Sequence, residues 1–184
     1  SGSDAVFLAA ATAARAGDSV LDVGCGAGAA GLCLKARVPD VNLHGLEFQA
    51  EYSDLARRNG VNTVWHGDLF APPPKLFEEP FDWIMTNPPF YRANNSTSPK
   101  TDRTIARRAE RPLSDWITAC LRRLKPKGGF AMVHQIDALP EAMHALHSMV
   151  GDIAVLPLQA RAGRPAKRMV LTARKGARGP FRLV

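Results

Sequence analysis

The stretch Ser19-Val20-Leu21-Asp22-Val23-Gly24-Cys25-Gly26-Ala27-Gly28 decides the fold. An apolar run with one acid, 19–23, leads directly into glycines at three alternate positions. Glycine tolerates φ > 0 and lets the backbone approach a ligand closely, so the stretch predicts a strand followed by a tight turn. A helix-forming stretch, 29–37, closed by Pro39, completes a strand–turn–helix unit. Such a unit predicts a ligand-binding turn at the carboxyl end of a parallel strand.

Strand and helix patterns alternate along the rest of the chain. Further strands are predicted at 41–46, 62–66, 81–86, 130–134, 153–158 and 168–173, and helices at 5–16, 50–59, 112–124 and 139–149. The proline-rich stretch 70–80 predicts a loop in place of a crossover helix, 125–129 predicts a turn, and the polar, basic stretch 90–111 predicts an exposed loop. This alternation predicts an α/β fold with a mostly parallel, seven-stranded sheet and helices on both faces.

Length and composition bound the class of protein. A chain of 184 residues predicts a single domain over 1–184, and 46% hydrophobic with 22% charged residues excludes disordered and fibrous classes. No apolar run reaches the ~18 residues of a membrane-spanning helix, and the start lacks a basic signal-peptide region. We therefore expect a cytoplasmic protein with no membrane partner. Three cysteines without Cys-x-x-Cys spacing indicate neither a disulfide framework nor a zinc site.

Charge is divided unevenly between the two halves. Residues 1–91 hold 6 Lys/Arg and 11 Asp/Glu, whereas residues 92–184 hold 18 and 6. The basic second half predicts a polyanion partner, because Lys and Arg contacts to phosphate dominate nucleic-acid affinity. A solvated surface with incidental charge is the alternative. The candidate RNA contacts form two clusters, Arg92, Lys100, Arg103, Arg107 and Arg108 after the fourth strand, and Arg161, Arg164, Lys167 and Arg168 between the last two strands.

Carboxylates stand at the ends of three successive predicted strands, at Asp22, Glu47 and Asp68. Ligands of open α/β sheets bind outside the carboxyl ends of the strands. S-adenosylmethionine suits these acids, because it carries a positive sulfonium and ammonium and has ribose hydroxyls that Glu47 can bind. Asp68, beside Leu69, can accept a hydrogen bond from the adenine amino group. The literal G-x-G-x-x-G at 26–31 leaves a nicotinamide-dependent oxidoreductase as an alternative, although Asp22 would repel a diphosphate.

The fourth predicted strand ends in Thr86-Asn87-Pro88-Pro89-Phe90. Two prolines fix the backbone and remove two amide donors, so carbonyl oxygens remain free to accept hydrogen bonds. The Asn87 side-chain oxygen and the Pro88 carbonyl can together accept both hydrogens of a planar amine and orient its lone pair toward a methyl group. Phe90 can stack on a flipped base. A structural turn with Phe90 in the core is the alternative.

These motifs, in this order, resemble the class I S-adenosylmethionine-dependent methyltransferases that act on planar amino nitrogens. The flanking segments SDAVFLAAATAARAGDSVLDVGCGAGAAGLCLKARVP, TNPPFY, LKPKGGF and GRPAKRMVLTARK are similar to the bacterial tRNA(Val) adenine-N6 methyltransferase family, over nearly the whole chain. The resemblance implies a Rossmann-like fold with an antiparallel last strand and methylation of adenine N6 in tRNA, with Asn87, Pro88, Pro89 and Phe90 in the catalytic motif. It implies a cofactor site at Asp4, Asp22, Gly24, Cys25, Gly26, Gly28, Glu47, Phe48, Asp68, Leu69 and Asn87.

Other interpretations stay open at this point. The same motif is shared by enzymes that methylate guanine N2 in rRNA or glutamine in a protein, and a non-catalytic nucleic-acid-binding module would keep the same charge pattern. Members of the family usually have further residues before 3–10, which suggests that this chain is truncated. Glu141 and His144 have the Glu-x-x-His spacing of a metal ligand pair, but a single such unit favours a polar helix face and no metal. The three tryptophans, Trp65, Trp83 and Trp116, are interpreted as core or helix-packing residues.

Overall fold

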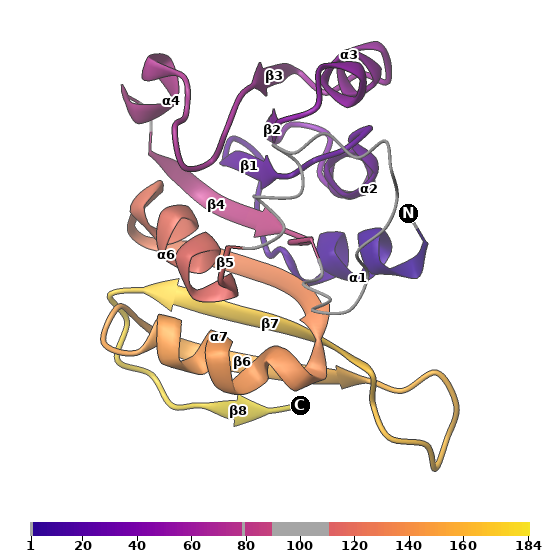
Figure 1. Ribbon diagram of the computed structural model, residues 1–184, viewed down its shortest axis with the longest axis vertical. Coiled ribbons are helices and arrows are strands. Elements are labelled where there is room, and N and C mark those ends of the chain that lie inside the picture. Colours follow the sequence, from indigo (N-terminus) through magenta and orange to yellow (C-terminus); the bar gives the residue numbers. More distant parts are fainter. Residues whose placement is uncertain (1, 79, 90–110) are drawn as a thin grey trace.

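The computed structural model describes residues 2–78, 80–89 and 111–184 (Figure 1). Its helices are α1 (Ser3–Ala11), α2 (Ala29–Arg37), α3 (Ala50–Arg58), α4 (Pro74–Glu78), α6 (Leu113–Arg122) and α7 (Leu139–Leu146), with a 3-10 helix η1 (Ile136–Ala138). Its strands are β1 (Ser19–Val23), β2 (Asn42–Glu47), β3 (Thr63–His66), β4 (Phe81–Thr86), β5 (Leu124–Gln135), β6 (Val150–Leu158), β7 (Arg168–Lys175) and β8 (Arg182–Leu183).

All eight of these strands form one sheet in the order β3-β2-β1-β4-β5-β7-β6-β8. β1 pairs in parallel with β2 and β4, and β4 pairs in parallel with β5, whereas β7 is antiparallel to both β5 and β6. The predicted mostly parallel sheet with an antiparallel late strand is therefore confirmed. The predicted count of seven strands misses β8, a two-residue edge strand whose sequence carries no strand pattern. The strand order reverses between β1 and β4, so the glycine turn and the Asn-Pro-Pro motif both lie at the switch point.

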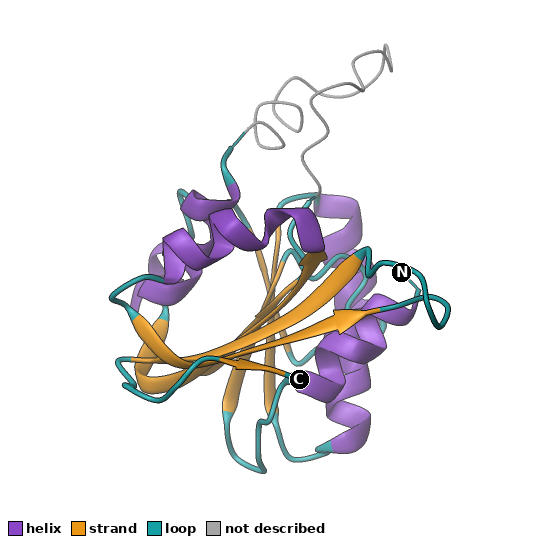
Figure 2. Cartoon of the chain, turned by 90° about the horizontal axis from the view of Figure 1, so that it is seen from below, coloured by secondary structure: helices purple, strands orange, loops and turns teal. Residues whose placement is uncertain are grey.

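Helices cover both faces of the sheet, as Figure 2 shows. One buried cluster joins the sheet to α1, α2 and α3, and a second joins it to α4, α6 and α7. Successive residues of the central strands alternate between the clusters, with Trp83 and Met85 in the first and Ile84 in the second. Parallel strands buried on both faces need apolar residues at nearly every position, which explains the continuous apolar runs of the sequence.

Several predicted boundaries are wrong; the helix predicted at 139–149, for example, ends at Leu146, and the strand predicted at 153–158 begins at Val150. The first helix ends at Ala11 instead of residue 16, because Arg37 of α2 donates to the carbonyls of Ala9 and Thr12 and the Thr12 hydroxyl donates to Leu8 O at 2.8 Å. The stretch 70–80 contains the short helix α4, whose first residue, Pro74, needs no amide partner at that position. The predicted turn 125–129 belongs to β5.

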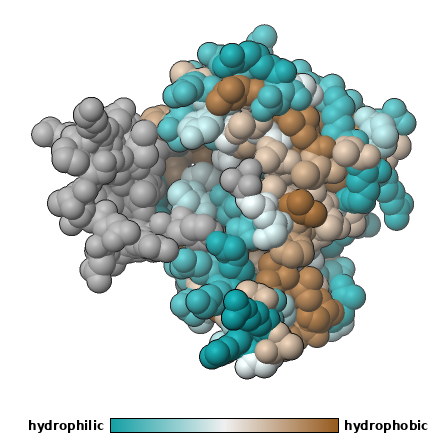
Figure 3. All heavy atoms as spheres, turned by 90° about the vertical axis from the view of Figure 1, so that its right-hand side faces the viewer, coloured by the Kyte–Doolittle hydropathy of each residue, from teal (hydrophilic) through white to brown (hydrophobic). Residues whose placement is uncertain are grey.

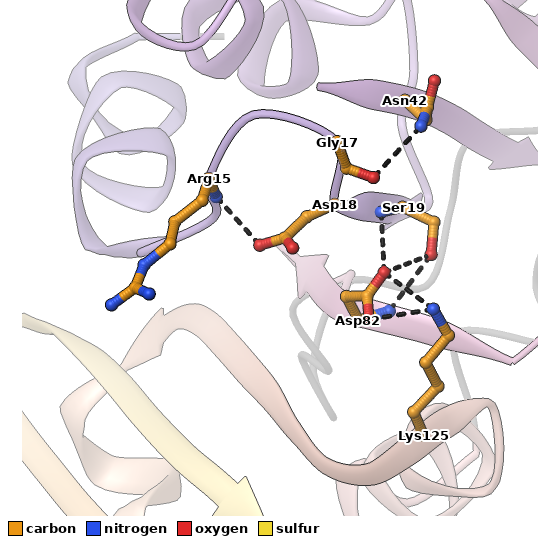
Figure 4. Close-up of polar contacts among 7 residues, drawn as sticks. All are labelled: Arg15, Gly17, Asp18, Ser19, Asn42, Asp82 and Lys125. Atoms are coloured by element: carbon orange, nitrogen blue, oxygen red, sulfur yellow. Dashed lines mark hydrogen bonds and ion pairs between the residues drawn. The ribbon is translucent and has the colours of Figure 1, made fainter. Parts of the chain in front are cut away.

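A polar cluster at the amino-terminal edge of the sheet explains why β5 starts early (Figure 4). The Ser19 amide and hydroxyl both donate to Asp82 Oδ2 at 2.9 Å, and Lys125 Nζ lies 2.8 and 2.9 Å from the two Asp82 oxygens. These bonds tie the starts of β1, β4 and β5 together. Partial burial acts to raise the pKa of Asp82, but the hydrogen bonds from Lys125 and Ser19 outweigh it and hold this pKa below its ordinary value.

Candidate active site

A cavity of about 400 Å³ opens at the edge where β1, β2 and β4 end. This volume lies in the range of cofactor and small-molecule sites. Figure 3 views the molecule from the side toward which these strands run, where hydrophobic residues gather over the middle and lower right of the face and hydrophilic residues surround them. The cavity is lined by Val23, Gly24, Gly26, Leu46, Glu47, Phe48, Gln49, Tyr52, Gly67, Leu69, Asn87, Pro89 and Trp116.

The glycine turn forms one wall of this cavity. Gly24 and Gly26 have φ of 72° and 53°, in the left-handed region that other residues rarely adopt. The Gly24 amide donates to Leu46 O at 2.8 Å, which fastens the turn to β2. Gly28 has φ of 89° but does not line the cavity, and a Cβ on it would lie 2.6 Å from Val61. Gly28 is therefore required by packing in this structure, and its cofactor contact stays a prediction.

Glu47 connects the turn to the end of β2. Its Oε2 accepts the Gly26 amide at 2.9 Å, and its Oε1 accepts the Gln49 amide at 2.8 Å. The residue is 7% exposed and lines the cavity. Each carboxylate oxygen has a second lone pair, so both can still accept a donor from a ligand. This geometry suits the predicted contact with ribose hydroxyls.

Asp22 lies beneath the turn and does not line the cavity. Its Oδ2 accepts the Gly31 amide in the first turn of α2 at 3.1 Å. Burial raises the pKa of Asp22 to about 7, the charge of Glu47 adds to the rise, and the Gly31 bond opposes it. Asp22 therefore supports the start of α2, and its contact with the cofactor stays a prediction.

The remaining predicted cofactor residues divide into two groups. Phe48 and Leu69 line the cavity, whereas Asp68 and Cys25 do not. Asp68 Oδ1 accepts the Phe70 amide at 2.8 Å and so shapes the turn that presents Leu69. The Cys25 side chain packs on β2, where a Cβ at position 45 would lie 2.7 Å from its Sγ, and burial raises the pKa of its thiol.

Asp4 lies at the start of α1, outside the cavity lining. Its Oδ1 is 3.1 Å from Arg168 Nη1, and this ion pair fastens α1 to the first residue of β7. Arg168 pairs in register with Gln135, the last residue of β5. Asp4 therefore lies near the carboxyl edge of the sheet, and its contact with a cofactor stays a prediction.

Asn87 directly follows β4 and lines the same cavity as the glycine turn. Its Oδ1 is buried and has no hydrogen-bond partner among the residues that the structure describes. Pro88 is buried beside it, and Pro89 lines the cavity. A buried acceptor without a donor costs free energy, so its presence in a cavity favours a ligand that brings an N–H or O–H group.

His134 supports the Asn-Pro-Pro segment from β5. Burial lowers the pKa of His134, while its hydrogen bonds with the backbone of Gln135 and Pro89 and the charge of Glu141 act in the opposite direction. Glu141 in turn accepts the Ser114 amide at 3.0 Å, which links α7 to α6. This use of Glu141 is structural, and within 2–78, 80–89 and 111–184 no three His, Cys, Asp or Glu side chains group as metal ligands would.

The two basic clusters have different outcomes. Phe90 and the first cluster, Arg92, Lys100, Arg103, Arg107 and Arg108, lie outside the described residues. The second cluster, Arg161, Arg164, Lys167 and Arg168, is exposed on and beside the β6–β7 connection. The Lys167 carbonyl accepts the Ile136 amide at 3.1 Å, so this connection lies beside the end of β5, on the edge of the sheet that also holds the cavity. No helix in the described part of the chain has the length and apolar character to cross a membrane.

Sequence reasoning missed six of the lining residues: Val23, Leu46, Gln49, Tyr52, Gly67 and Trp116. Val23 and Leu46 directly precede the predicted residues Gly24 and Glu47. Gln49 and Tyr52 belong to the segment directly after Glu47, and Gly67 directly precedes Asp68. Their closeness in sequence to predicted site residues could have identified them. Trp116 is different, because it comes from α6 and its position in an amphipathic pattern is that of a core residue. The interpretation of Trp116 as a core residue is incomplete, since it is buried and also lines the cavity.

Comparison with solved structures gives the fold class that the sheet and the cavity indicate. A predicted O-methyltransferase, protein Atu636 from Agrobacterium tumefaciens, superposes with a TM-score of 0.78 over 98% of this chain and 84% of that one, at 24% identity. The common fold is the Rossmann-like methyltransferase fold. At this identity the likeness establishes the fold alone.

The chain belongs to the methyltransferase small domain family, whose model matches residues 2–160. Two relatives are named tRNA1(Val) (adenine(37)-N6)-methyltransferase. The protein from Aeromonas hydrophila subsp. hydrophila is 28% identical over 95% of this chain and 76% of its own length. The protein from Porphyromonas gingivalis is 29% identical over 76% of this chain, and the match spans 60% of its own length.

Proposed function

We propose that this chain transfers a methyl group from S-adenosylmethionine to the exocyclic N6 amine of an adenine in tRNA. The observation that carries the proposal is Asn87, which lines the same cavity as the glycine turn and Glu47 and whose buried Oδ1 has no hydrogen-bond partner in the described part of the chain. The tRNA acceptor is supported by the names of the relatives and by the excess of positive charge in residues 92–184.

The residues of the cavity fit S-adenosylmethionine. Glu47 has free lone pairs for the ribose hydroxyls, and Phe48 and Leu69 supply apolar walls for the adenine ring. Gly24 and Gly26 present backbone without side chains, so a ligand can approach the end of β1 closely. When bound, this cofactor supplies an electrophilic methyl group on a positively charged sulfur.

Asn87 and Pro88 are the residues that act on the amine. An exocyclic amine is a poor nucleophile because its lone pair is delocalised into the ring. The Asn87 Oδ1 and the Pro88 carbonyl accept its two hydrogens, which favours a tetrahedral nitrogen and directs the lone pair into the cavity. Asn87 is neutral, so it orients the amine without removing a proton before the transfer. Phe90 is proposed to stack on the flipped base.

The basic clusters are proposed to hold the tRNA backbone. The exposed side chains of Arg161, Arg164 and Lys167 lie on the same edge of the sheet as the cavity. Contacts to phosphate position a nucleic acid without reading its sequence. These residues therefore account for binding, while the choice of adenine rests on the pocket.

Methylation of tRNA with a labelled cofactor tests the proposal. Total tRNA from a strain that lacks the activity is incubated with the wild-type chain, and the modified nucleoside is identified by mass spectrometry. We expect N6-methyladenosine, and a loss of ~100-fold or more in rate for Asn87→Ala, since removing one group that stabilises a transition state costs about that much. Asn42→Ala is the matched control, because it is the same substitution at the opposite edge of the sheet, where the Asn42 side chain donates to Gly17 O.

The alternatives give different results in the same experiments. Preferential label in rRNA would assign guanine N2 as the methyl acceptor instead of adenine N6, and preferential label in a release factor would assign a protein glutamine. No binding of S-adenosylhomocysteine at millimolar concentration would favour a non-catalytic nucleic-acid-binding module. Binding of NADH in the same calorimetric titration would favour an oxidoreductase.

A further inference from the structure

Trp116 of α6 is hydrogen-bonded to the end of β4 and is connected through Thr86 to the end of β1. Its indole Nε1 donates to Thr86 Oγ1 at 3.0 Å, and the Thr86 hydroxyl donates to Val23 O at 2.8 Å. Trp116 is 9% exposed and Thr86 is fully buried. The Thr86 hydroxyl thus acts as acceptor and donor at once. This relay connects the residue before Asn87 with the residue before Gly24.

The position of the indole ring is restrained from more than one side. A Cβ on Gly24 would lie 3.5 Å from the ring, and Phe70 packs edge-on against it with a centroid distance of 6.1 Å. The guanidinium of Arg111 covers the Phe70 ring at 4.3 Å. Trp116 also lines the cavity. The ring is therefore a fixed part of the cavity wall that contacts the glycine turn.

The relay acts where the sheet itself stops. The register of β1 against β4 ends with Val23 opposite Thr86, and the next residues on each strand, Gly24 and Asn87, have left the ladder. The turn and Asn87 therefore lie beyond the last paired residues of the β1–β4 ladder. The Trp116–Thr86–Val23 relay provides a side-chain restraint at that position.

We infer that Trp116 and Thr86 are positioning residues, which hold Asn87 and the glycine turn at the separation that methyl transfer requires. The inference rests on the proposed function, because it assigns Asn87 to the acceptor amine and the turn to the cofactor. A displacement of about 1 Å between reacting groups can lower a rate ~100-fold. Loss of the relay therefore lowers the rate of transfer more than it lowers affinity for the cofactor.

Four single variants and the double variant Thr86→Val/Trp116→Phe test this inference. Thr86→Val keeps the shape of the side chain and removes the hydroxyl, and Trp116→Phe keeps an aromatic ring and removes the Nε1 donor. Thr86→Ser keeps the hydroxyl that Thr86→Val removes. Trp65→Phe is the matched control, since Trp65 is partly buried and its Nε1 has no partner among the described residues. Thermal unfolding checks that each variant is folded.

The first readout is the single-turnover rate of methyl transfer beside the affinity for S-adenosylhomocysteine. We expect Thr86→Val and Trp116→Phe to lose ~10- to 100-fold in rate with an affinity within about threefold of wild type. The double variant should lose no more than the worse single variant, because both changes break one relay. Thr86→Ser and Trp65→Phe should keep rates near wild type. Rates near wild type in both relay variants would overturn the inference, as would a matching loss in Trp65→Phe.

The second readout does not need an RNA acceptor. The Asn87 side-chain amide signal is followed by ¹⁵N NMR during titration with S-adenosylhomocysteine, in wild type and Thr86→Val. We expect the ligand to shift this signal in wild type and to shift it differently in the variant, and an identical response would overturn the inference. If wild type binds S-adenosylhomocysteine but methylates no RNA, the proposed function fails, and the NMR readout alone then decides whether Trp116 and Thr86 position Asn87. If wild type binds no S-adenosylhomocysteine, both are overturned.

Discussion

Asp22→Asn should stabilise the protein at pH 8 much more than at pH 5. Asp22 is buried beneath the glycine turn and accepts one bond, from the Gly31 amide, which an asparagine oxygen can also accept. Burial, with the charge of Glu47 adding to it, raises the pKa of Asp22 from 3.8 to about 7. The folded protein therefore holds a proton that the unfolded chain releases. The contribution of Asp22 to the free energy of unfolding is fully present below pH 3.8 and is lost as the pH rises through about 7.

The magnitude follows from the size of the pKa change. At ~1.4 kcal/mol per unit, a rise from 3.8 to about 7 removes ~4 kcal/mol of stability above pH 7. Of this, ~2.5 kcal/mol is lost between about pH 5 and pH 8. The asparagine variant does not titrate, so the gap in free energy of unfolding between variant and wild type widens by that amount. For a chain of this length it corresponds to a further ~5–10 °C in Tm.

Thermal unfolding of wild type and variant at the two pH values measures this gap. Every other titrating group is common to both proteins, so its contribution cancels in the difference. Asp40→Asn is the control, because it is the same substitution at an exposed position and removes no buried carboxylate. A gap for Asp22→Asn that is equal at pH 5 and pH 8 would refute the reasoning, since it would mean that burial does not shift the ionisation of Asp22.

Three further predictions concern the site, the sheet edge and the RNA surface. Glu47→Gln should weaken binding of S-adenosylhomocysteine about tenfold or more, as measured by calorimetry. Glu47 accepts hydrogen bonds from two backbone amides, and in the variant one of these amides would face the NH2 group, which cannot accept a bond. Asp82→Asn should lower the free energy of unfolding by ~1 kcal/mol at neutral pH, as measured by urea titration. This loss should fade as the pH falls through the lowered pKa of Asp82, because the wild-type side chain then becomes neutral like that of the variant. Arg161→Glu with Arg164→Glu should weaken tRNA binding and flatten its salt dependence by about one unit of slope or more, and filter binding at several salt concentrations with an unchanged slope would contradict a phosphate contact.

The sequence by itself determined the order of the motifs and the class of fold. Apolar runs alternating with helical stretches predicted a parallel sheet covered on both faces, and strand–turn–helix spacing placed the glycine turn and Asn87 at strand ends. In a parallel sheet the carboxyl ends of the strands meet at one edge, so residues at strand ends converge whatever the intervening chain does. The shared cavity of Gly24, Glu47 and Asn87 agrees with this.

Only the tertiary structure decided which side chains reach the cavity. Asp22 and Glu47 both lie near strand ends, yet Asp22 accepts a bond from α2 and Glu47 lines the cavity. The register pairs Asp22 with Gly45, two residues before Glu47, so Asp22 lies further from the carboxyl edge of the sheet. Trp116 fits a helical core pattern, and its bond to Thr86 arises only when α6 packs against β4. The early start of β5 likewise depends on Asp82, 43 residues from Lys125. The periodicity of the sequence determines which residues share a face of a helix or strand. Contacts between elements that are remote in sequence determine which residues that face packs against.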